Sequence, residues 1–178
     1  MRALKVIGIL VAVLIAGVLV VAAMQPDTFR IERSIAIKAP PEKVFAILED
    51  FDRGPEWSSY EKKDPAMKRS RSGPAKGKGA IYAFEGNKDV GAGRLEITDA
   101  APPNRLLIRL DMLKPFEASN TIEYTLASQG GATQVTQAMF GPMPFISKVM
   151  CLFFSMEKMV GPDFEASLAG LKGLAEKG

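Results

Sequence analysis

The stretch RIERSIAIKAPPEKVFAILEDFDRGPEW, residues 30–57, decides the fold. Apolar and polar residues alternate over 29–38, which indicates a half-buried strand, although Arg33 falls on the apolar face. Pro41 and Glu42 then suit the first turn of a helix, and the apolar residues that follow recur at helical spacing. The stretch therefore predicts a strand followed directly by an amphipathic helix.

The segment before this stretch is apolar enough to cross a membrane. Residues 6–24, VIGILVAVLIAGVLVVAAM, carry no charge, and as a helix they would span roughly 28 Å, close to the hydrocarbon thickness of about 30 Å. This length favours an uncleaved signal anchor, because the apolar region of a cleaved signal peptide is usually shorter. Arg2 and Lys5 favour a cytoplasmic N-terminus and so a domain on the periplasmic or extracellular side. Secretion after cleavage is the alternative.

The chain divides into four predicted parts. These are a short N-terminal tail over 1–5, the transmembrane helix over 6–24, a linker over 25–28 and one domain over 29–177. The last part has a length that suits a single domain with one hydrophobic core.

Downstream of Trp57, a loop is predicted over 61–79, and turn signals then separate five strand-like segments. These segments are 79–86, 90–99, 104–113, 117–127 and 132–140. Their short connections favour antiparallel neighbours. Apolar residues then recur at helical steps from Ile146 to Leu171, with a kink or a restart expected at Pro162. This order predicts an α+β fold in which a curved antiparallel sheet wraps around a long C-terminal helix.

Composition excludes several kinds of site. The sequence has no histidine and one cysteine, Cys151, so it has no internal disulfide, no Cys-rich metal site and no histidine-based nucleophile. We therefore expect no metal and no cofactor, and an enzyme is less favoured than a binding protein. The formal net charge of +3 is too small to indicate a nucleic-acid partner.

Two stretches carry a family resemblance: residues 30–57, and MEKMVGPDFEASLAGLKGLAE, residues 156–176. Together they resemble the START-related, polyketide cyclase/dehydrase-like (SRPBCC) superfamily, over 29–177. The resemblance implies a helix-grip fold with an internal cavity for apolar small molecules. It fixes no activity, because relatives range from lipid carriers to aromatase/cyclases, and it carries no catalytic residue over to this chain. The N-terminal membrane anchor is an addition to that domain.

The candidate cavity residues are apolar or aromatic side chains of the strands and helices, with Asn120 as a polar group that could orient a ligand. They are Trp57, Tyr82, Phe84, Leu110, Met112, Phe116, Asn120, Tyr124, Met150, Phe153 and Phe154. Ordinary core packing is the competing interpretation, and for Asn120 it is a structural hydrogen bond. The segment 141–154 is also a candidate pocket lid or interfacial helix.

The loop predicted over 61–79 is strongly basic, which makes it a candidate contact with anionic lipid. The membrane-surface candidates are Lys62, Lys63, Lys68, Arg69 and Arg71. A solvated loop without a function is the alternative. Because no aromatic residues are interleaved with these charges, the loop does not indicate nucleic-acid binding.

Three functional hypotheses follow from these patterns and from the family resemblance. The first is a membrane-anchored, non-enzymatic domain that binds a lipid or other hydrophobic small molecule in an internal cavity. The second is a polyketide cyclase/dehydratase-like enzyme, which would need an acid–base side chain facing the cavity. The third is a protein-interaction module, which an exposed apolar patch on the domain would favour.

Overall fold

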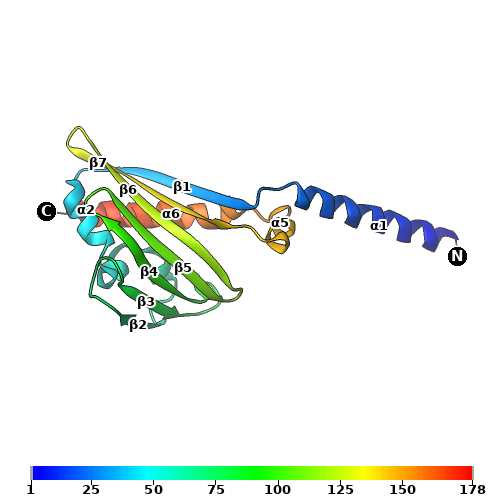
Figure 1. Ribbon diagram of the computed structural model, residues 1–178, viewed down its shortest axis with the longest axis horizontal. Coiled ribbons are helices and arrows are strands. Elements are labelled where there is room, and N and C mark those ends of the chain that lie inside the picture. Colours follow the sequence, from blue (N-terminus) through cyan, green and yellow to red (C-terminus); the bar gives the residue numbers. More distant parts are fainter. Residues whose placement is uncertain (1, 178) are drawn as a thin grey trace.

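Two parts make up the molecule in the computed structural model, which describes residues 2–177. One apolar helix, α1 (Arg2–Ala23), extends from one end of a domain built from a sheet and helices (Figure 1). The sheet is antiparallel and packs against the C-terminal helix α6 (Met156–Ala175). The predicted α+β helix-grip class is therefore confirmed.

The sheet has seven strands, whose spatial order is β1-β7-β6-β5-β4-β3-β2. Their bounds are β1 (Thr28–Ile37), β2 (Lys68–Ser72), β3 (Ile81–Glu85), β4 (Ala92–Ala101), β5 (Arg105–Lys114), β6 (Ala118–Gln129) and β7 (Ala132–Pro142). The first strand pairs with the last, and every other pair is formed by neighbours in sequence. The predicted strand over 29–38 and the five later ones are confirmed, with small shifts at their ends.

Short helices connect β1 to β2, and another connects β7 to α6. They are α2 (Pro41–Leu48), the 3₁₀ helix η1 (Phe51–Arg53), α3 (Gly54–Trp57), α4 (Ser59–Lys63) and α5 (Phe145–Cys151). The helix predicted after the first strand is confirmed, since α2 begins with a proline and has a glutamate in its first turn.

The loop predicted over 61–79 is wrong in part, because it contains the end of α4 and the edge strand β2. The sequence of β2, KRSRS, has no apolar residue and so carries no strand signal. A charged edge strand is nevertheless stable when its neighbour supplies the backbone pairing, and the charges discourage further strands from adding.

The C-terminal helical region divides at a different place from the one predicted. Helix α6 runs through Pro162 without a restart. The division lies between Cys151 and Met156, where the Ser155 hydroxyl accepts a hydrogen bond from the Lys158 N–H at 3.3 Å. Serine is a favoured N-cap because its oxygen satisfies a free N–H of the first turn, so this residue begins the new helix.

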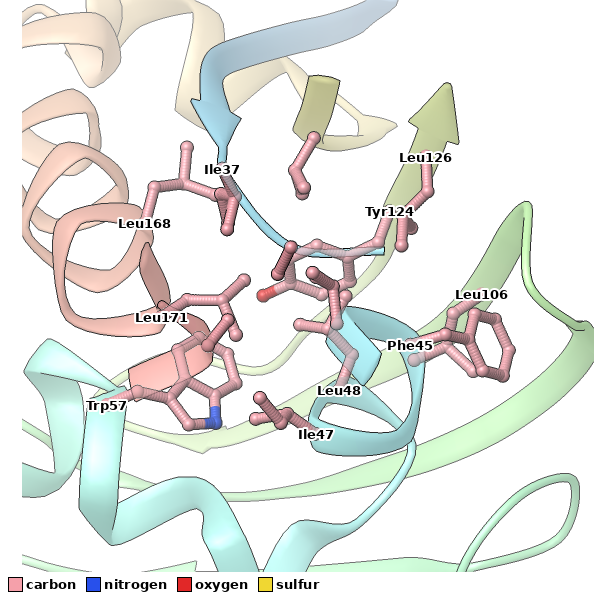
Figure 2. Packing of buried hydrophobic residues seen from close by; sticks show 14 of the residues in the cluster. Ile37, Phe45, Ile47, Leu48, Trp57, Leu106, Tyr124, Leu126, Leu168 and Leu171 are labelled. Atoms are coloured by element: carbon pink, nitrogen blue, oxygen red, sulfur yellow. The ribbon is translucent and has the colours of Figure 1, made fainter. Parts of the chain in front are cut away.

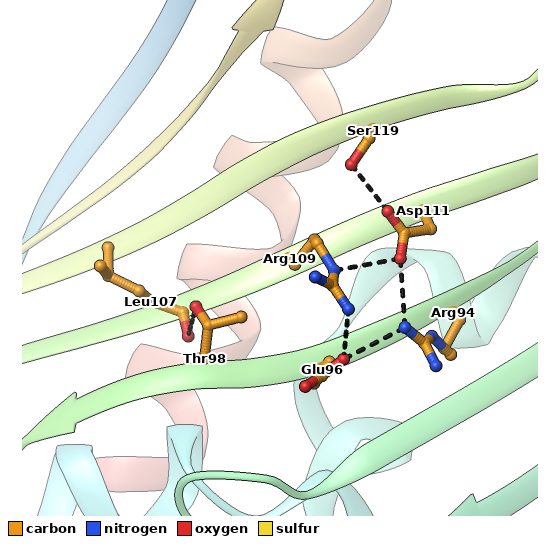
Figure 3. Close-up of polar contacts among 7 residues, drawn as sticks. All are labelled: Arg94, Glu96, Thr98, Leu107, Arg109, Asp111 and Ser119. Atoms are coloured by element: carbon orange, nitrogen blue, oxygen red, sulfur yellow. Dashed lines mark hydrogen bonds and ion pairs between the residues drawn. The ribbon is translucent and has the colours of Figure 1, made fainter.

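The outer face of the sheet is polar. On β4 and β5, Arg109 lies 2.5 Å from Glu96 and 3.2 Å from Asp111 (Figure 3). Arg94 bridges the same two carboxylates, and Ser119 on β6 donates a hydrogen bond to Asp111 at 2.7 Å (Figure 3). These cross-strand charge pairs suit a face in contact with water, which leaves the opposite face for packing.

The inner face packs against α2, α3 and α6. Ile47 and Leu48 of α2 meet Trp57 of α3, Leu171 of α6 and Tyr124 of β6 in one cluster of buried side chains (Figure 2). Side chains therefore fill the space between sheet and helix near α2.

The two ends of the domain differ in what they carry. The register places Thr28 of β1 opposite Pro142 of β7, and Met112 of β5 opposite Ala118 of β6. These positions lie at the end where α1 leads into β1, which we call the α1 end (Figure 1). Helix α2 follows β1 at the opposite end, which we call the α2 end.

Helix α6 runs in the same direction as β1. Near its start, Glu157 pairs with Arg33 at 2.5 Å, and near its end, Lys172 donates a hydrogen bond to the carbonyl of Ala36 at 2.6 Å. The first turn of α6 therefore lies at the α1 end.

Candidate functional site

Burial of the inner face decreases from the α2 end to the α1 end. On β5, Leu106 is fully buried, whereas Leu110 and Met112 further along the same face are partly exposed. On β6, Tyr124 is 5% exposed and Asn120 is partly exposed. The inner face is thus fully buried at the α2 end and becomes partly exposed at the α1 end, beyond a second buried cluster of Ile31, Met139 and Phe164.

A polar group lies in the middle of this face. Gln137 of β7 is the cross-strand neighbour of Tyr124 on β6 and of Arg33 on β1. Its side chain is 4% exposed, and its Oε1 has no hydrogen-bond partner among the residues that the structure describes. A buried acceptor without a partner costs about 1–3 kcal/mol, so a ligand that donates a hydrogen bond there would be favoured.

Gln137 was not among the predicted site residues. Its signal in the sequence is the one that singled out Asn120, a polar residue on the apolar face of a strand, here between Val135 and Met139. The strand phase could therefore have identified it.

Arg33 of β1, which lies beside Gln137 in the sheet, is already paired with two carboxylates. Its guanidinium lies 2.7 Å from Glu165 and 2.5 Å from Glu157, both on α6. Hydrogen bonds to Glu165 and then Glu157 raise the pKa of Arg33. It therefore ties β1 to α6 and is not free to bind a ligand carboxylate.

Trp57 and Tyr124, two predicted cavity residues, contact each other in the core. Their rings meet edge to face with centroids 6.4 Å apart. Burial raises the pKa of Tyr124 above its ordinary value of 10.0, so the phenol keeps its proton near neutral pH. The indole Nε1 of Trp57 is buried without a hydrogen-bond partner within the described chain.

Tyr82 and Phe84 belong to a separate cluster beneath β2 and β3. Their rings stack with centroids 6.2 Å apart, and Tyr82 also contacts Phe51. The Tyr82 hydroxyl donates a hydrogen bond to Glu61, whose other oxygen pairs with Arg69 at 2.8 Å. Burial and then the bond to Glu61 raise the pKa of Tyr82. This cluster is mainly apolar, and its polar contacts with Glu61 and Arg69 lie at the side of the sheet, apart from Gln137.

Leu110, Met112 and Asn120 lie together in the partly exposed part of the inner face. Asn120 lies opposite Leu110 on β5, and its amide packs against the backbone of Gly141, where a larger residue would collide with it. These three predicted residues therefore share the partly exposed α1 end of the inner face, where Leu110 packs against the buried cluster of Ile31, Met139 and Phe164.

Phe116, Met150, Phe153 and Phe154 do not line the interior. Phe116 in the β5–β6 turn is 72% exposed, and Phe153 after α5 is 67% exposed. All four lie on the surface at the α1 end of the domain. The predicted cavity set is thus split between the core, the partly exposed part of the inner face and this surface.

The predicted membrane-surface residues are mostly paired with carboxylates. Lys63 lies 2.6 Å from Asp163, and Arg69 is held by Glu61. Arg71 lies 2.5 Å from Asp52. Only Lys62 and Lys68 of this set are exposed without an ion pair in the part of the chain that the structure describes. The basic segment therefore offers less free charge than its sequence suggests.

Two surface hollows lie away from the inner face. One, of about 120 Å³, is bordered by Phe51, Arg71 and residues 72–75. The other, of about 210 Å³, lies between α2 and Pro102-Pro103. Neither is lined by a predicted cavity residue.

Solved structures with the same fold support this architecture. The Aha1 dimer from Colwellia psychrerythraea matches with a TM-score of 0.59 and 20% identity, covering 84% of this chain and 98% of that chain. Protein CV1439 from Chromobacterium violaceum matches with a TM-score of 0.60 and 16% identity, covering 86% and 100%. The di-domain ARO/CYC StfQ from the steffimycin biosynthetic pathway matches with a TM-score of 0.64 and 10% identity, covering 84% and 51%.

No curated protein matches the chain. Residues 28–176 match the family described as "Polyketide cyclase / dehydrase and lipid transport". That match spans nearly the whole domain, from the first residue of β1 to the end of α6. The chain therefore belongs to the polyketide cyclase / dehydrase and lipid transport family of the SRPBCC superfamily, with an apolar helix preceding the family domain.

Proposed function

We propose that the protein is a membrane-anchored domain that binds a lipid or other hydrophobic small molecule between its sheet and α6, without catalysing a reaction. The observation that carries the proposal is the gradient of burial along the inner face. The interior is packed at the α2 end, and apolar side chains such as Leu110 and Met112 are partly exposed at the α1 end.

Binding would come from burial of apolar ligand surface against these partly exposed side chains, at roughly 25 cal/mol per Å². A polar group of the ligand would be oriented by the unpaired acceptor of Gln137 or by the amide of Asn120. Such a site combines a mostly apolar lining with a few placed polar groups, as ligand sites usually do.

The anchor in this proposal is α1. Its segment Lys5–Ala23 has a mean hydropathy of 3.1 and is 6% buried, so almost all of its apolar surface is free to meet lipid. We place the N-terminus in the cytoplasm and the domain on the periplasmic or extracellular side. In the alternative, α1 is a cleaved signal sequence and the domain is secreted.

Native mass spectrometry of the full-length protein in mild detergent tests the binding proposal. We expect a hydrophobic adduct on the wild type. Gln137→Met should retain roughly fivefold less of it, because one hydrogen bond to the ligand is lost. The matched control is Gln134→Met, the same change at a partly exposed position of the same strand with the opposite strand phase, which should retain the wild-type amount.

Gln137→Met keeps the side-chain volume and removes an unpaired buried acceptor, so the domain should be no less stable. Full-length protein that carries no adduct, even after incubation with mixed membrane lipids, would contradict the proposal.

The second candidate is a cyclase or dehydratase. Its candidate acid–base groups are the hydrogen-bonded Tyr82 and Glu61, which are able to move a proton but lie at the side of the sheet, apart from the inner face that the first candidate uses. Structural likeness to two-domain ARO/CYC proteins also fits this candidate. The same mass measurement distinguishes the two functions, because an enzyme would release its bound molecule with an altered mass, for example after loss of water, whereas a carrier would release it unchanged.

A further inference from the structure

The exposed large apolar side chains of the domain gather at its α1 end. Within the described residues after Met24, they are Leu113, Phe116, Phe145, Ile146, Met150, Phe153, Phe154 and Met159. Those from Phe145 onwards belong to α5, the turn after it and the first turn of α6, and we call them the α5 patch. An apolar surface of this kind, confined to one place, marks a contact with a partner or a membrane.

Helix α5 exposes its apolar side chains, whereas an ordinary surface helix buries them. Its one charged residue, Lys148, is 6% exposed, and its Nζ lies 2.6 Å from the exposed carboxylate of Asp27, which neutralises its charge. Its apolar residues point outward, with Ile146 68% exposed. The helix therefore presents an uncharged apolar face to its surroundings.

The α5 patch lies directly beside the start of the domain, where α1 ends (Figure 1). The Met143 N–H donates a hydrogen bond to the Asp27 carbonyl at 2.7 Å, and Lys148 binds the side chain of the same residue. Ala22, in the last turn of α1, is fully buried. These contacts hold α5 beside the last turn of α1, so the apolar surfaces of the two helices are adjacent.

We propose that the α5 patch inserts into the interfacial layer of the same bilayer that α1 crosses, and so holds the partly exposed α1 end of the inner face against the lipid. This inference rests on the anchoring role proposed for α1. The occupant is a lipid surface because the patch adjoins the apolar surface of α1 and because the one charge of α5, on Lys148, is neutralised by Asp27. The exposed Lys158 beside Met159 suits the headgroup layer.

Spin labels on the full-length protein in vesicles of phosphatidylcholine and phosphatidylglycerol test this arrangement. In a Cys151→Ser background, single cysteines replace Leu14 in α1, Phe153 in the patch and Ser128 near the α2 end. Collision with oxygen reports the apolar layer, and collision with a water-soluble nickel chelate reports the aqueous phase.

We expect labels at Leu14 and Phe153 to favour oxygen and the label at Ser128 to favour nickel. Phe154→Cys gives a second, independent position that should behave like Phe153. A Leu14 label in the apolar layer together with aqueous labels at both patch positions would overturn the docking of α5 while leaving α1 as an anchor.

Aqueous labels at every position would overturn the anchor and the docking together. Spin–spin broadening between patch labels would show that a second copy of the chain covers the patch, which also contradicts the inference. Failure of ligand binding would appear in the mass measurement alone, so the two failures are distinguishable.

Discussion

Asp111 on the outer face of the sheet depends on a small number of neighbours for its acidity. The hydrogen bond from Ser119 lowers the pKa of Asp111 most, and the charges of Arg109 and Arg94 lower it further (Figure 3). A carboxyl whose pKa is lowered in the folded state stabilises the fold above its ordinary pKa. That stabilisation is lost as the pH falls through the lowered value.

Ser119→Ala should therefore raise the pKa of Asp111 towards its ordinary value of 3.8. The acid loss of stability should then begin at a higher pH, because the carboxyl is protonated sooner. Carboxyl-detected NMR titration of the full-length protein in detergent measures the change. Ser70→Ala, at an exposed position of β2, is the control and should leave this pKa unaltered. An unchanged titration of Asp111 in Ser119→Ala would contradict the prediction.

Strand phase predicts which single residues face inward, but it does not predict their partners. The inward positions of Tyr124 and Asn120 follow from alternation along one strand. The pairing of Arg33 with Glu157 and Glu165 depends on which turn of α6 lies over β1, and no local pattern contains that information. For the same reason, the carboxylates that hold Arg69 and Arg71 were not predicted.

At the scale of elements, α6 approaches α3 closely at one glycine. A Cβ added at Gly170 would meet the backbone of Trp57, which cannot move without shifting α3. A Cβ added at Gly173, one turn later in the same helix, would meet nothing within 4 Å. The two positions thus separate the effect of packing from the effect of helix propensity.

Gly170→Ala should destabilise the domain by about 1–3 kcal/mol, because overpacking forces the backbone apart. Gly173→Ala should stabilise it by about 0.5–1 kcal/mol, because alanine favours the helix. Denaturant unfolding of the full-length proteins in detergent, followed by circular dichroism, measures both. Changes of the same sign in the two variants would show that α6 does not make this contact with α3.

The elements with an alternating or helical apolar pattern were predicted correctly from the sequence, as in β1 and α2. Strand β2 was missed because KRSRS contains no apolar residue and owes its structure to pairing with β3. The boundary between α5 and α6 was misplaced because proline is the stronger local signal, whereas the capping contact of Ser155 decides the outcome.

At the scale of the whole molecule, the topology proposed for the membrane predicts where a label can react. With Cys151→Ser as background, Ser128→Cys places one exposed thiol near the α2 end. A membrane-impermeant maleimide should label it on intact cells, and the membrane fraction should contain the uncleaved chain of 19.2 kDa. Labelling that requires lysis would place the domain in the cytoplasm, and a shortened soluble product would favour the cleaved form.

The arrangement of the whole molecule was predicted only in part. The family domain and the preceding apolar helix follow from the sequence pattern. The decrease in burial along the inner face towards α1 depends on the direction of α6 along β1 and on the filling of the α2 end by Ile47, Leu48 and Trp57. Phe116 and Phe153 were predicted to line the cavity because an aromatic residue usually lies in the interior. The sequence does not show which residues lie at the end of the domain.

The connection between α1 and the domain is short. The residues between Ala23 and Thr28 reach at most about 14 Å when fully extended, and Asp27 among them is held by Lys148. With α1 in a bilayer, the domain would remain within one molecular diameter of its own leaflet. It could exchange a bound molecule with that leaflet or with another protein that reaches the membrane, but it could not carry the molecule to a second membrane. The protein would therefore meet its transfer partners by lateral diffusion in the plane of the membrane. A partner from elsewhere would have to reach that membrane.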